Sequence, residues 1–109
     1  MKFGLADKSI DLIKQAMSKF ETIEKVAVFG SRAMGNYRPG SDVDIALYGN
    51  IEPSIRDQLS VQLNEVLPLP YFFDIVVVAQ LTNQDLIKHI KDVGLPLYDK
   101  EEGDADEGD

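Results

Sequence analysis

The chain has 109 residues, of which 44% are hydrophobic, and it carries a formal net charge of −8 and no cysteine. This length fits one domain, and the lack of cysteine excludes a disulfide framework, a cysteine zinc site and a thiol nucleophile. Residues 99–109 hold seven acids and one lysine, which leaves residues 1–98 at only −2, without the long basic stripe that binding of duplex nucleic acid requires.

The charge distribution also predicts the domain organisation. We expect one domain over residues 1–98 and an acidic disordered tail over residues 99–109, because the tail has no periodic apolar positions. We interpret the tail as solubilising, with a docking role as the alternative. No signal peptide is recognisable and no apolar run approaches about 18 residues, so we expect a cytoplasmic protein without membrane contact.

A helix and a strand open the predicted fold. Asp7 can cap a helix over roughly residues 8–20. Apolar side chains at helical spacing mark its buried face: Ile10, Ile13, Met17 and Phe20. The apolar run KVAVF at residues 25–29 predicts a buried strand. Residues 30–41, rich in glycine and serine, predict a loop with one short helical turn.

The second half of the chain continues with alternating strands and helices. Residues 43–48 predict a strand, and Pro53 suits the first turn of a helix over roughly residues 53–66. The run FFDIVVV at residues 72–78 predicts a third strand. Thr82 can cap a last helix over roughly residues 83–92, which Gly94 ends. The order α-β-β-α-β-α predicts an α/β or α+β fold with a small sheet covered by helices.

Three aspartates stand where acids are costly. Asp42 and Asp44 open the second strand, and because strand side chains alternate, both point to the same face. Two residues of strand advance by roughly 6.5–7 Å, so both carboxylates can reach one ion. Asp74 interrupts an otherwise apolar strand, where a charge needs a partner or a metal. This oxygen-rich group suits Mg²⁺, or Mn²⁺, better than zinc, and in two-metal phosphoryl chemistry two ions share such a site.

The loop before Asp42 predicts a phosphate-binding segment. Gly30 and Ser31 directly follow a strand, and their N–H groups and the Ser31 hydroxyl can bind phosphate oxygens. Arg32 and Arg38 are the cations near this loop, and either can offset the charge of a leaving pyrophosphate.

Each feature alone has an ordinary structural explanation. Gly-Ser after a strand is commonly a turn, Asp-x-Asp is often a loop or cap feature, and Asp74 can be paired with a buried base. Their occurrence together, in this order, favours a metal- and phosphate-binding site. The only histidine, His89, is expected at the surface, and with no cysteine the chain offers little support for a Ser-His-Asp mechanism.

Together these motifs resemble a known family. The segments Phe29-Gly30-Ser31-Arg32 and Gly40-Ser41-Asp42-Val43-Asp44 are similar to the signature of the DNA polymerase β-type nucleotidyltransferases, especially the minimal ones of bacteria and archaea. The resemblance covers roughly residues 8–98. It implies a small mixed sheet flanked by helices.

The resemblance also implies roles for the site residues. Asp42 and Asp44 match the metal-binding pair, and Asp74 matches the third carboxylate, which shares the catalytic metal and helps to deprotonate the acceptor hydroxyl. Gly30 and Ser31 match the phosphate-binding residues. Larger members carry further domains for the base and the acceptor, so here the acceptor site is expected to be open or completed by another chain.

Minimal nucleotidyltransferases are typically paired with a helical HEPN-class protein that resembles an RNase toxin. The resemblance therefore implies an antitoxin that transfers AMP from ATP to a toxin tyrosine, with Mg²⁺ as cofactor. Two alternatives stay open: a binding module that neutralises its partner by contact, and a transferase acting on a small molecule. The carboxylate triad favours the enzyme, because contact alone does not require three acids.

Overall fold

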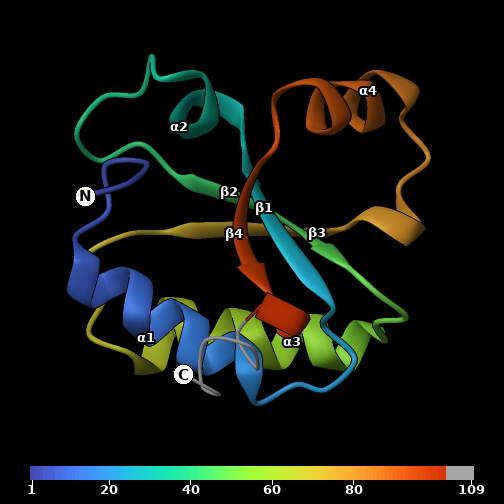
Figure 1. The fold of residues 1–109 in the computed structure, drawn as a ribbon, viewed down its shortest axis with the longest axis horizontal. Coiled ribbons are helices and arrows are strands. Elements are labelled where there is room, and N and C mark those ends of the chain that lie inside the picture. Colours follow the sequence, from blue (N-terminus) through green and yellow to red (C-terminus); the bar gives the residue numbers. More distant parts are fainter. Residues whose placement is uncertain (103–109) are drawn as a thin grey trace.

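The computed structural model describes residues 1–102, whose fold is drawn in Figure 1. In chain order the elements are α1 (Asp7–Ser18), β1 (Lys25–Phe29), α2 (Gly30–Met34), β2 (Val43–Tyr48), α3 (Pro53–Val61), the π-helical turn η1 (Gln62–Val66), β3 (Phe73–Val77), the 3₁₀ turn η2 (Val78–Gln80), α4 (Gln84–Val93) and β4 (Leu95–Asp99). The predicted helices and strands are present, and β4 is an addition to them.

The strands form one mixed sheet in the order β3-β2-β1-β4. β1 runs antiparallel to both of its neighbours, whereas β2 and β3 are parallel. A parallel pair needs a crossover between its strands, and α3 with η1 supplies it. This arrangement confirms the expected small mixed sheet flanked by helices.

Helices cover both faces of the sheet, with α1 and α3 on one side and α2 and α4 on the other (Figure 1). The alternation of strand residues matches these two layers. Ile45 belongs to the large core on the α1/α3 side, whereas the next residue, Ala46, packs with Ile90 of α4 in a smaller cluster. Asp44 and Asp74 alternate with large-core residues and therefore lie on the α2/α4 face.

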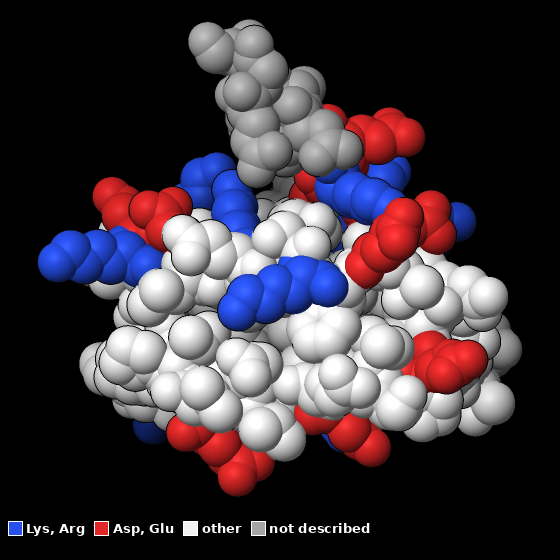
Figure 2. All heavy atoms as spheres, turned by 90° about the horizontal axis from the view of Figure 1, so that it is seen from below, with Lys and Arg blue, Asp and Glu red and all other residues white. Residues whose placement is uncertain are grey.

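The opposite face differs in character. Figure 2 looks at the molecule from below Figure 1, onto the side of α1 and α3, and shows a broad area with few charged side chains. Two exposed valines belong to this helix layer: Val61 ends α3 and Val66 ends η1. Asp44 and Asp74, which lie on the α2/α4 face, are thus on the other side of the sheet from this area.

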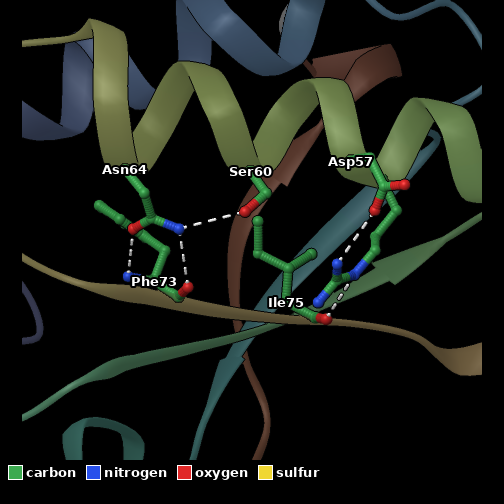
Figure 3. A network of polar contacts seen from close by, with 6 residues as sticks. Asp57, Ser60, Asn64, Phe73 and Ile75 are labelled. Carbon is green, nitrogen blue, oxygen red and sulfur yellow. Dashed lines mark hydrogen bonds and ion pairs between the residues drawn. The ribbon is translucent and has the colours of Figure 1, made fainter.

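Side chains from the crossover helix fasten the outer strand β3 (Figure 3). The Asn64 amide donates to the carbonyl oxygen of Phe73 at 3.1 Å, and its oxygen accepts from the Phe73 N–H at 2.7 Å. Arg56 Nε donates to the carbonyl oxygen of Ile75 at 3.1 Å. These bonds fix the backbone on either side of Asp74.

Two predicted helix caps are wrong. Asp7 is the first residue of α1 rather than its cap; Ala6 precedes the helix, and the Asp7 carboxylate pairs with the N-terminal amine at 3.0 Å. At α4 the cap is Asn83, not Thr82, because the Asn83 side chain accepts the N–H of Leu86. Asparagine at this position satisfies a free helix N–H. Gly94 ends α4 as expected.

The strand β4 was not foreseen, because its sequence contains Pro96 and borders the acidic segment. Proline is tolerated at a sheet edge, and the pairing of β4 with β1 shifts in register at this point. Asp99 ends β4 and residues 100–102 are helical, so the structure extends beyond residue 98. The rest of the predicted acidic tail lies outside the described residues. Within residues 1–102, no helix is long and apolar enough to span a membrane.

Candidate active site

The three predicted aspartates come together at one end of the parallel strand pair. Asp44 of β2 and Asp74 of β3 are direct partners in the parallel register. Asp42 lies one residue before β2, whose pairing begins where the Val43 N–H donates to the Phe72 carbonyl oxygen. Asp42 and Asp74 are exposed, whereas Asp44 is half-buried.

Electrostatic interactions connect Asp44 to the other two carboxylates. Burial raises the pKa of Asp44, and the negative charges of Asp74 and Asp42 raise it further. His89 and Arg32 act in the opposite direction and lower the same pKa. Asp44 is thus the central acid of the group, and its charged form is disfavoured by the other two.

Such a group fits a divalent cation by its chemistry. Carboxylate oxygens are the donors that Mg²⁺ and Mn²⁺ prefer, and a bound cation relieves the repulsion at Asp44. In residues 1–102, however, no three histidine, aspartate or glutamate side chains stand in an arrangement ready to hold a metal ion. The residues Asp42, Asp44 and Asp74 supply the donors, and binding would require their side chains to converge.

Gly30 lies against the central acid. Its φ of +69° is in the region that favours glycine, and a Cβ at this position would overlap Oδ2 of Asp44. The chain therefore requires glycine here to bring the end of β1 close to the carboxylate. Ser31 follows in α2 and is half-buried.

His89 is part of this site, contrary to the expectation that it lies free at the surface. Its Nε2 accepts the Gly30 N–H at 3.1 Å, and its ring meets that of Phe29 edge-on with centroids 6.0 Å apart. The ring is half-buried. The sequence carried one signal of this position, since His89 directly precedes Ile90 and lies three residues after Leu86, both on the inward side of α4.

Arg32 is buried and engaged with the backbone. Nε and Nη2 donate to the carbonyl oxygen of Ser41 at 3.1 and 2.7 Å, and Nη1 donates to that of Phe3 at 2.8 Å. The guanidinium also lies over the rings of Tyr37 and Tyr71. Because Ser41 immediately precedes Asp42, these bonds from Arg32 fix the backbone next to Asp42. Phosphate contact by Arg32 stays a prediction.

Comparison with solved structures supports the fold. A chain in the crystal structure of a toxin–antitoxin with AMP-PNP is 20% identical, with a TM-score of 0.67 over 93% of this chain and 79% of that one. A chain in the complex of tri-AMPylated Shewanella oneidensis HEPN toxin with MNT antitoxin is 18% identical, with a TM-score of 0.63 over 90% and 76%. In the toxin–antitoxin MntA–HepT the identity is 17% and the TM-score 0.64, over 92% and 78%.

Sequence comparison assigns the family. No curated protein matches the chain. The family model described as polymerase beta, nucleotidyltransferase, matches residues 11–103, which include β1 to β4 and all three aspartates. The chain therefore belongs to the polymerase beta nucleotidyltransferase family.

Proposed function

We propose that this chain is a Mg²⁺-dependent nucleotidyltransferase that moves AMP from ATP to a hydroxyl of a partner protein. The partner is a HEPN-class toxin, the acceptor is a tyrosine, and the transfer makes the chain an antitoxin. The observation that carries the proposal is the group of Asp42, Asp44 and Asp74 beside the Gly30 turn. The family of the chain supports nucleotidyl transfer as the reaction class. The complexes of its structural neighbours support a HEPN-class toxin as the partner.

In the proposed reaction the residues of the site have different roles. Gly30 forms the close turn after β1 and Ser31 contacts the triphosphate, whereas Asp74 lies on β3, beyond β2, and faces the acceptor. Asp42, Asp44 and Asp74 would hold Mg²⁺, which would supply positive charge to the triphosphate and to the attacking oxygen. The acceptor oxygen bonds to the α-phosphorus, the bond to the β-phosphate breaks and pyrophosphate leaves. The hydroxyl proton passes to the Asp74 carboxylate.

A double variant tests this reaction. Asp42→Ala combined with Asp44→Ala removes two donors, and we expect loss of at least about a hundredfold in label transfer from α-labelled ATP to the partner protein. The matched control combines Asp11→Ala with Glu65→Ala, which removes two exposed acids from α1 and η1 on the other side of the sheet. Transfer at the wild-type rate by the aspartate variant would refute the proposed reaction.

Neutralisation by contact is the second candidate. It is favoured by the fact that three structural neighbours are in toxin–antitoxin complexes. The same double variant separates the two functions. If it is mixed with an equal amount of toxin and the RNase activity stays blocked, contact suffices. If the RNase activity returns, AMP transfer is required.

A further inference from the structure

The hydrogen bond between Gly30 and His89 has a consequence for the nucleotide site. We infer that His89 is a positioning residue: it accepts the Gly30 N–H and holds the turn at the end of β1 so that Ser31 meets the phosphates. The inference rests on the proposed nucleotidyl transfer. It concerns how the phosphate-binding turn is kept in place. The sequence pattern predicted Gly30 and Ser31 in this turn but not a residue that supports it.

The geometry explains why the turn needs such support. With its positive φ, Gly30 is held between the Asp44 carboxylate on one side and the His89 ring on the other. Glycine has the most backbone freedom of any residue, so an ordered glycine turn requires contacts that restrict it. An acceptor at 3.1 Å from the Gly30 nitrogen provides one, and it also satisfies an N–H beside a repulsive group of acids.

The histidine is itself well anchored. Its neighbour Ile90 is buried in the small core with Phe29, and the ring of Phe29 meets the His89 ring edge-on. Nε2 is the acceptor of the bond, and the Gly30 N–H is its donor. α4 thereby connects to the turn through a fixed acceptor rather than through a mobile surface side chain.

The bond from Gly30 to His89 also gives Gly30 and Ser31 different roles. The Gly30 N–H is already bonded to His89, whereas the Ser31 hydroxyl has no hydrogen-bond partner within residues 1–102. Ser31 is therefore the residue of the pair that remains available for a phosphate oxygen. Loss of His89 should weaken binding of the triphosphate while leaving the three carboxylates in place.

Two amide substitutions and one apolar substitution distinguish this role from a general packing role. Glutamine places an acceptor at the distance of Nε2 from the backbone, whereas asparagine reaches only as far as Nδ1. We expect His89→Gln to bind a non-hydrolysable ATP analogue with Mg²⁺ within about twofold of wild type. His89→Asn and His89→Leu should bind it about three- to tenfold more weakly, the effect of one neutral hydrogen bond. Calorimetric titration measures these affinities without catalysis.

Kinetics and a surface control complete the test. The KM for ATP should rise with the dissociation constant while kcat changes by less than about twofold. Lys91→Gln replaces an exposed residue on the same helix and should change neither the KM for ATP nor kcat. Equal affinities for the Gln and Asn variants would overturn the positioning role. Failure of the wild-type chain to bind the analogue would instead overturn the proposed function.

Discussion

At the scale of single residues, Asp44 shows how the fold carries an electrostatic cost. Burial raises its pKa, and Asp74 and Asp42 add to the rise. In metal-free protein the folded state therefore keeps the Asp44 proton to a higher pH than the unfolded chain does. This contribution to stability is present at low pH and is lost as the pH rises from the ordinary aspartate pKa through the raised folded value.

Asp44→Asn removes that cost. In chelator at about pH 7 the variant should melt a few degrees above wild type, and the difference should shrink as the pH falls towards about 4. The increase is small because the carboxylate is only half-buried. Added Mg²⁺ should raise the melting temperature of wild type but not of the variant, since only a cation bound to the folded state stabilises it. Thermal unfolding with Asp11→Asn as control measures both effects.

A variant that melts below wild type in chelator at neutral pH would contradict this account of Asp44. It would mean that the favourable contacts of the carboxylate, including those with His89 and Arg32, outweigh its burial and the repulsion from Asp42 and Asp74.

Arg32 and His89 show what the sequence could not convey about single residues. Both are polar residues for which a pattern predicts exposure or a ligand, yet Arg32 is buried under two tyrosine rings and His89 accepts a backbone N–H. Their partners are 29 and 59 residues away along the chain, at Phe3 and Gly30. Such contacts depend on how α2 and α4 pack on the sheet, which local spacing does not encode. Gly30 and Asp74, by contrast, could be singled out from the sequence. A glycine directly after a strand indicates an unusual backbone conformation, and a charge in an apolar strand needs a partner or a metal.

At the scale of elements, the crossover helix determines where Asp74 lies. β3 is an edge strand, and an open edge exposes unpaired N–H and C=O groups. Asn64 and Arg56 bond to Phe73 and Ile75, the two neighbours of Asp74 (Figure 3). The π-helical turn η1 places Asn64 opposite this edge. Wide turns of this kind often occur at functional positions.

Asn64→Ala should therefore destabilise the fold by about 1–3 kcal/mol, because both the N–H and the carbonyl of Phe73 lose their partner. Urea unfolding followed by circular dichroism measures the change. The control is Glu65→Ala, the next residue on the same turn, which is exposed and should stay within about 0.5 kcal/mol of wild type. Equal midpoints for the two variants would show that the amide contributes nothing to the edge.

Element prediction from the sequence succeeded where apolar periodicity was strong and failed where tertiary pairing decided. The runs at residues 25–29 and 43–48 and the Pro53 helix start match the structure. β4 was missed because LPLYD has no alternation, and its strand conformation depends on pairing with β1. The cap of α4 fell one residue away from Thr82, where either residue type was suitable.

At the scale of the whole molecule, one face of a three-layer unit carries the site. Asp42 and Asp74 are exposed, and within residues 1–102 the only helices on their face are α2 and α4. The family resemblance foresaw an incomplete acceptor site, which agrees with the exposure of these two acids. An enzyme of this form holds one reactant and depends on a second molecule to bring the other.

The dependence can be measured as pyrophosphate release. With ATP and Mg²⁺ alone, we expect slow release, because no described element orients an acceptor at Asp74. Addition of the HEPN-class partner should raise the rate more than about tenfold, since docking converts a bimolecular encounter into a positioned one. A partner whose acceptor tyrosine is replaced by phenylalanine should bind without this stimulation. Full release without partner would mean that water or a small molecule serves as acceptor, and the site would then be complete in this chain alone.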